Sequence, residues 1–89
     1  MIARRAVISG RVQGVGFRFF AERVAREAGV RGWVRNLSDG NVETVVEGNE
    51  EAVTLYLERL RRGPMGAKVM ALAAEEVRLS HYESFEITR

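Results

Sequence analysis

The sequence predicts an α+β fold in which two helices cover one face of a single antiparallel sheet. Residues 5–12 alternate between two faces, which is the period of a strand, whereas apolar residues between 17 and 28 recur at steps of three and four, which is the period of a helix. The predicted order of elements is strand, helix, strand, strand, helix, strand, with a short strand appended. This split βαβ order is that of a ferredoxin-like sandwich, βαββαβ plus a short extra strand.

The first strand and the first helix are joined by a segment rich in glycine. In the strand, Ala6 and Ile8 share one face with Val12. The helix is expected over residues 17–28, where the apolar residues form one stripe, and Gly29 ends it.

A hairpin is predicted in the middle of the chain. Residues 30–36 and 41–47 are rich in strand-forming residues and flank Leu37-Ser38-Asp39-Gly40. The Asp-Gly pair in this segment is a strong signal for a tight turn.

The second helix is expected to begin after Asn49, because asparagine is a favourable N-cap and acidic residues follow it. Gly63-Pro64 ends this helix. Residues 68–77 and 83–88 are then expected as the last two strands. The buried stripe of the helix is expected to contain Val53, Tyr56, Leu57 and Leu60.

This topology brings two distant parts of the chain together. In a split βαβ unit the first and second strands flank a central strand position, so their ends lie close to each other. Asn36, at the end of the second strand, is therefore expected near Arg18, at the start of the first helix.

Length and composition narrow the range of functions. The chain has 89 residues, which predicts a single domain, residues 1–89, with one site. It contains no cysteine, which excludes disulfides, thiolate nucleophiles and cysteine-ligated zinc. Neither a long apolar run nor a charged-then-apolar leader is present, so a cytoplasmic protein without a membrane span is expected. The net charge is only +2, and 13 of the 14 basic residues are arginine.

The segment from Gly10 to Arg18, with the sequence GRVQGVGFR, predicts an anion-binding loop. Glycines let the backbone turn with its N–H groups pointing inward, and a helix N-terminus adds unpaired donors and a partial positive charge. Arg18 would supply a planar, two-pronged donor to the same ligand. The segment lacks a Walker lysine and the Rossmann spacing, so a single small phosphoryl group is the expected ligand.

This segment also resembles the first motif of the acylphosphatase family, in which Val12-Gln13-Gly14-Val15 precedes Phe17 and Arg18. The family's second motif is matched by Gly29-Val30-Arg31-Gly32-Trp33-Val34-Arg35-Asn36, followed by Asp39-Gly40-Asn41-Val42-Glu43 and Glu47-Gly48. Both motifs stand in the family's order, and the resemblance extends over essentially the whole chain. Departures are confined to the alanine-rich strand around Met70.

The resemblance implies two catalytic residues, Arg18 and Asn36. Arg18 would grip the phosphate oxygens, and Asn36 would orient the attacking water through an amide that both donates and accepts hydrogen bonds. An amide cannot act as a general base, so its contribution would be positioning and electrostatic support. The remaining phosphate-binding residues would be Gln13, Gly14, Val15, Gly16 and Phe17, which would contribute mainly backbone N–H groups.

Each of these residues has an alternative interpretation. Most arginines on helices are solvated surface side chains, although the position of Arg18 directly after a glycine loop argues against this. Asn36 stands just before an Asp-Gly turn, where asparagine commonly forms the turn by bonding its own backbone. The glycine segment could be a plain strand-to-helix turn.

Other residues suited to chemistry are scattered. His81 is the only histidine and is expected in a surface loop, and Trp33 is expected to pack on a strand face or to be partly exposed. No acid/base pair or metal cluster is recognisable. The acidic residues expected at strand and helix surfaces are Glu43, Glu47, Glu50, Glu51, Glu75 and Glu76.

The predicted reaction is hydrolysis of the carboxyl-phosphate bond of small acyl phosphates, with no metal, no cofactor and a monomeric chain. An acyl phosphate releases a carboxylate, which is a weak base and needs no general acid, so backbone amides, one arginine and one asparagine would suffice.

Two other classes of function stay open. RNA-recognition motifs share this order of elements, and Gly16-Phe17-Arg18-Phe19-Phe20 faintly resembles one of their signatures, but it falls on a helical period here. The second class is a regulatory or anion-binding domain that does not turn over a substrate. Similar domains occur in larger maturation proteins that handle carbamoyl phosphate. Binding to nucleic acid or to a membrane is not expected.

Overall fold

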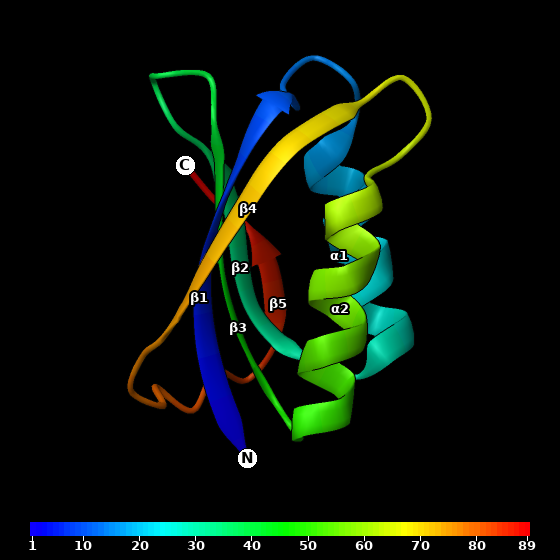
Figure 1. The fold of residues 1–89 in the computed structure, drawn as a ribbon. Helices are drawn as coiled ribbons and strands as arrows, with labels where there is room; N and C mark the ends of the chain where they lie inside the picture. Colours follow the sequence, from blue (N-terminus) through cyan, green and yellow to red (C-terminus); the bar gives the residue numbers. More distant parts are fainter.

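The computed structural model describes all residues from 1 to 89 and places two helices on one face of a five-stranded sheet (Figure 1). The elements are β1 (Ile2–Arg11), α1 (Phe17–Ala28), β2 (Arg31–Asn36), β3 (Val42–Gly48), α2 (Glu50–Arg62), β4 (Lys68–Glu76) and β5 (Phe85–Ile87). No helix is both long and apolar enough to cross a membrane.

The strand order β4-β1-β3-β2-β5 confirms the ferredoxin-like α+β fold. β1 and β2 flank β3, as the sequence predicts, and pair with it antiparallel. The added strand differs from the expectation of one antiparallel sheet, because β5 pairs parallel to β2 and makes the sheet mixed. β4 ends at the end of the sheet where β2 begins, and β5 starts from that same end, so β5 runs in the same direction as β2.

The core lies between the sheet and the two helices. The inward-facing strand residues Ile8, Val34 and Val46 pack against residues of both helices, among them Phe17 and Leu60. All five side chains are almost completely excluded from solvent, as expected for the apolar stripes on which the prediction rests.

A buried polar contact ties the second helix to the sheet. The hydroxyl of Tyr56, on α2, lies 2.8 Å from that of Thr44 on β3. Thr44 in turn donates to the main-chain carbonyl of Trp33 on β2, at 2.7 Å. Burial raises the pKa of Tyr56, so this phenol stays a neutral hydrogen-bonding group.

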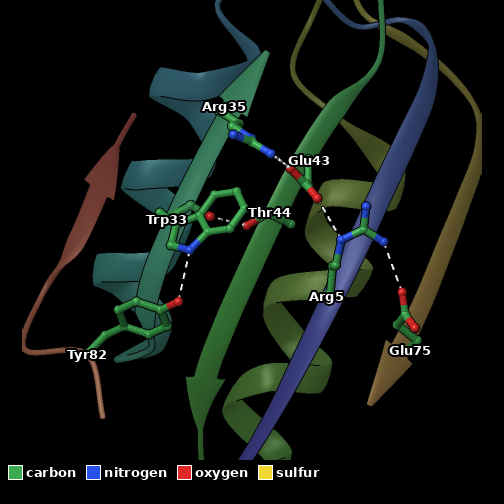
Figure 2. A network of polar contacts seen from close by, with 7 residues as sticks. All are labelled: Arg5, Trp33, Arg35, Glu43, Thr44, Glu75 and Tyr82. Atoms are coloured by element: carbon green, nitrogen blue, oxygen red, sulfur yellow. Dashed lines mark hydrogen bonds and ion pairs between the residues drawn. The ribbon is translucent and has the colours of Figure 1, made fainter. Parts of the chain in front are cut away.

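The sheet face opposite the helices carries a row of charges that crosses four strands (Figure 2). Glu43 on β3 accepts hydrogen bonds from Arg35 on β2, at 2.7 Å, and from Arg5 on β1, at 2.6 Å. Arg5 also donates to Glu75 on β4, at 2.9 Å. Because the two arginines enclose its carboxylate, Glu43 is buried, and the expectation that it lies at the surface is wrong.

Glu47 is the second buried carboxylate, which again corrects the expectation of a surface position. It accepts hydrogen bonds from the main-chain N–H groups of Ser80, His81 and Tyr82 and so fixes the loop between β4 and β5. His81 is exposed in this loop, as predicted. Both buried carboxylates are thus held by structural partners.

Candidate active site

The predicted anion-binding loop begins where β1 ends. Val12 anchors it, since its side chain is fully buried in the core. Gly14 and Gly16 then adopt φ values of 76° and 75°, a left-handed conformation that favours glycine, and the chain turns into α1. We call residues 12–18, the segment predicted to bind phosphate, the phosphate loop.

Gly10 has a different role from the one predicted. Its φ is 120°, and a Cβ atom there would collide with the backbone of Lys68 and Met70 on β4. The register between β1 and β4 shifts at this point, between Ser9 and Gly10. Gly10 therefore permits close approach of two strands at a bulge and lies before the phosphate loop.

The N-terminus of α1 is left open. Gly16 is its N-cap and has no side chain to bond the first turn, and no acidic residue lies in that turn. The N-terminus of α2 shows the contrast, because there Asn49 accepts a hydrogen bond from Ala52 N–H at 2.8 Å and Glu50 follows. The first N–H groups of α1 therefore keep their donor capacity and partial positive charge for a ligand.

Arg18 lies in the first turn of α1 and is half-buried. Its guanidinium makes no hydrogen bond or ion pair within the chain. It differs in this from Arg5 and Arg35, which are both engaged by Glu43. Arg18 is therefore a positively charged side chain without an internal partner, in the first turn of a helix whose N-terminus is uncapped.

Gln13 joins the phosphate loop to the β2–β3 hairpin. Its side-chain amide donates two hydrogen bonds, to the main-chain carbonyls of Leu37 at 2.7 Å and Asn41 at 2.8 Å. These residues also bond each other, since Leu37 N–H donates to Asn41 O at 2.8 Å. The sequence predicts mainly backbone donors from Gln13, so this side-chain contact is a finding of the structure.

Asn36 is the last residue of β2, immediately before the hairpin loop that Gln13 holds. It pairs with Val42 on β3, which on its other side pairs with Ile8 on β1, so Asn36 lies in one row with a residue near the end of β1. Two strand spacings, about 10 Å, separate their backbones. The structure thereby brings Asn36 to the end of the sheet where the phosphate loop lies.

The interpretation of Asn36 as a turn former is not supported. Its side chain is half-buried and makes no hydrogen bond within the chain. Asp39 takes the turn-forming role, because its carboxylate accepts from Asn41 N–H at 2.9 Å. Asn36, like Arg18, is a polar side chain without an internal partner.

The other predicted phosphate-loop residues divide by exposure. Gly14 and Gly16 are exposed, whereas Phe17 is buried in the core, so only its backbone can face a ligand. Val15 packs against the edge of the core. Phe17 and Phe20 form an edge-to-face pair inside α1, which removes the aromatic strand face that an RNA-recognition motif requires.

Neither the phosphate loop nor Asn36 lines a surface hollow of the molecule. The two surface hollows of the molecule lie elsewhere, and the larger, of about 470 Å³, is bounded by β2, β5 and the C-terminal residues. No group of three or more histidine, aspartate or glutamate side chains is arranged so that it could hold a metal ion. The candidate ligand-binding groups at this end of the sheet are therefore the backbone amides of the phosphate loop, the Arg18 guanidinium and the Asn36 amide.

Comparison with known proteins identifies the family. The family model described as acylphosphatase matches residues 4–87. The chain belongs to the acylphosphatase family. An acylphosphatase from Archaeoglobus fulgidus is 44% identical over 87 residues, which cover 98% of each chain.

Solved structures give the same result. The crystal structure of acylphosphatase from Bacillus subtilis matches with a TM-score of 0.97 and 38% identity and is covered completely, as is this chain. T. kodakarensis HypF matches with a TM-score of 0.88 and 35% identity, but this chain covers only 12% of that protein. Acylphosphatase-like folds therefore occur both alone and as a small part of a longer chain.

Proposed function

We propose that this member of the acylphosphatase family hydrolyses the carboxyl-phosphate bond of small acyl phosphates, giving a carboxylate and inorganic phosphate. One observation carries the proposal. Two polar side chains without internal partners, Arg18 and Asn36, come from elements that Gln13 ties together at one end of the sheet.

The phosphoryl group would lie in the phosphate loop. N–H groups of residues 13–18 would point at its oxygens, and Arg18 would donate two parallel hydrogen bonds that fix its orientation. The absence of a cap and of acidic residues in the first turn of α1 supports this binding mode.

Asn36 would orient the attacking water. Its amide can accept a hydrogen bond from the water and donate one to a phosphoryl oxygen, which places the water in line with the bond that breaks. The water oxygen then bonds to phosphorus while the P–O bond to the acyl group breaks, and the electron pair leaves with the carboxylate. A phosphoryl oxygen takes the proton of the water, since no carboxylate or histidine lies at the loop to accept it.

The nature of the leaving group explains why so few residues suffice. A monoester must expel an alkoxide, which requires a general acid, a metal ion or a covalent nucleophile. An acyl phosphate expels a carboxylate, a much weaker base. Positioning and charge stabilisation of the kind that Arg18 and the amides offer can carry such a phosphoryl transfer.

The proposed site is complete in one chain, because the phosphate loop and Asn36 belong to the same molecule. We therefore propose that the protein acts as a monomer on a small-molecule substrate, without a cofactor. The cytoplasmic location stays a prediction from the sequence.

Hydrolysis of benzoyl phosphate in the presence of EDTA tests the function, with p-nitrophenyl phosphate as the monoester control. The expected result is turnover of the acyl phosphate that persists in EDTA, is slow on the monoester and is lost in Arg18→Ala. Arg78→Ala, which removes an exposed arginine from the loop after β4, is the matched control and should retain full activity. A folded native protein that does not turn over benzoyl phosphate would overturn the proposal.

A further inference from the structure

Charge is unevenly distributed between the two ends of the molecule. Three segments approach the end that holds the phosphate loop: residues 10–18, the β2–β3 turn at residues 36–42, and residues 59–70, which run from the end of α2 into β4 (Figure 1). One acidic residue, Asp39, lies in these segments. Their six basic residues are Arg11, Arg18, Arg59, Arg61, Arg62 and Lys68.

The opposite end contains charges of both signs. Residues 47–51 and 75–83 contribute six acidic side chains, and Arg4 pairs there with Glu76 at 3.6 Å. The net charge is only +2, but the charges are unequally divided between the two ends of the molecule. The end with the phosphate loop carries an excess of positive charge.

Most of the cations at this end have no counterion. Arg59 pairs with Glu27 at 3.5 Å, but the others make no ion pair. We call the four exposed ones that lie outside the proposed catalytic site the cationic rim. It consists of Arg11, Arg61, Arg62 and Lys68.

A stabilising effect on the fold accounts for the positive charge of only two of the four rim residues. Arg61 and Arg62 lie in the last turn of α2, where positive charge stabilises the helix dipole. Arg11 and Lys68 are direct partners on β1 and β4, and like charges in such a cross-strand pair repel each other. Neither residue forms an ion pair with a carboxylate of the chain. An anion bound from solution would therefore reduce the repulsion between them.

Simple electrostatics indicates how large the effect of the rim can be. In water without added salt, a dianion about 10 Å from one positive charge is favoured by about fourfold, so two such charges give about sixteenfold, and partial screening at about 10 mM ionic strength lowers this to about tenfold. At about 0.5 M salt the Debye length falls below about 5 Å, and most of this attraction is lost. The effect would act on capture of the substrate rather than on the chemical step.

We propose that the cationic rim attracts acyl phosphates to the phosphate loop and favours those whose acyl group carries a second negative charge. This inference rests on the proposed function and adds a substrate preference to it. The preferred substrates are monophosphorylated dicarboxylic acids and similar anionic acyl phosphates. The rim residues are positioning residues for substrate capture and take no part in phosphoryl transfer.

The test compares benzoyl phosphate with 4-carboxybenzoyl phosphate, which differ by one negative charge. The native protein should show a higher kcat/KM for 4-carboxybenzoyl phosphate at about 10 mM ionic strength, by about threefold, and the preference should vanish at about 0.5 M NaCl. In the double variant Arg11→Gln/Lys68→Gln, kcat/KM at low salt should fall by about tenfold while kcat changes by less than about twofold.

Arg78→Gln is the matched control, because it removes an exposed arginine from the opposite end of the molecule. Its kcat/KM should stay within about twofold of the native value. An equal loss in Arg78→Gln and in the double variant would overturn the role of the rim, as would turnover of both substrates without salt dependence. Failure of the native protein to turn over either substrate would instead overturn the proposed function, and the rim's role with it.

Discussion

The side-chain amide of Gln13 lies 2.7 Å from the main-chain carbonyl of Leu37, across 24 positions of the sequence. Gln13 belongs to the phosphate loop, and Leu37 directly follows Asn36. A second hydrogen bond, to the carbonyl of Asn41, uses the other hydrogen of the same amide. One side chain therefore fixes the distance between the segment proposed to bind phosphate and the segment proposed to orient water.

Gln13→Glu should separate these two segments. A carboxylate cannot donate to the carbonyls of Leu37 and Asn41, so the hairpin should move away from the phosphate loop. We expect kcat to fall by about tenfold or more, because small misplacements at a reacting centre are costly, and stability to fall by about 1–3 kcal/mol. Inhibition by inorganic phosphate should change much less, since the loop and Arg18 remain.

Asn49→Ala is the control for the loss of stability alone. It removes the cap of α2 at the far end of the molecule and should cost about 1 kcal/mol without changing kcat. If Gln13→Glu retains the native kcat, the coupling between the phosphate loop and the hairpin has no catalytic role.

Arg18 and Asn36 should differ in what they contribute. Arg18→Lys keeps the charge but loses the two-pronged geometry, so inhibition by inorganic phosphate should weaken together with kcat/KM. Asn36→Ala removes a group that acts on water, so kcat should fall by about 10²–10³ while phosphate inhibition stays nearly native. Steady-state kinetics with phosphate as inhibitor separates the two roles. Native kcat in Asn36→Ala would exclude the role in orienting water.

Stability should fall in acid because of the two buried carboxylates. Burial alone would raise the pKa of Glu47, but hydrogen bonds from the backbone N–H groups of Ser80, Tyr82 and His81 outweigh it, and the pKa is lowered. The pKa of Glu43 is likewise lowered, because hydrogen bonds from Arg35 and Arg5 outweigh the effect of burial.

The sign of the pH dependence follows from these directions. A carboxyl group whose pKa is lower in the folded state stabilises the fold above its unfolded pKa, about 4.3 for glutamate, and this contribution disappears as the pH falls through the folded pKa. Urea unfolding between about pH 7 and pH 3 should show this loss in the native protein. Glu47→Gln should be less stable than the native protein at neutral pH and should show a flatter acid dependence.

Glu83→Gln is the matched control for this measurement, because Glu83 is exposed and has no partner within the chain. Its acid dependence should match that of the native protein. An unchanged slope in Glu47→Gln would show that this carboxylate does not contribute to acid unfolding.

Local signals in the sequence predict most of the fold. The helix expected over residues 17–28 has those bounds in the structure, because its apolar period is regular and Gly29 ends it with a φ of 79°. Asn49 caps α2 as expected. The first strand is longer than predicted and begins at Ile2, since its start is fixed by pairing with Gly48 on β3, a contact that no local pattern encodes.

The residues proposed for the candidate site come from the sequence and stay a prediction, whereas the contacts that join their segments come from the structure. Motif and resemblance indicate Arg18 and Asn36, and the topology explains why their segments lie at the same end of the sheet. The side-chain bonds of Gln13 could not be predicted, because they join residues 24 and 28 positions apart. The burial of Glu43 is a similar case, although Arg35, which lies opposite it in the observed hairpin, carries the opposite charge and so offered a signal.

The most direct measurement for the central claim is a single turnover of benzoyl phosphate by excess enzyme in ¹⁸O-labelled water, with mass analysis of both products. Attack of an oriented water on phosphorus predicts that one labelled oxygen enters inorganic phosphate and that benzoate stays unlabelled. Label found in benzoate would mean that the carbonyl carbon is attacked, which would contradict the roles given to the phosphate loop, Arg18 and Asn36.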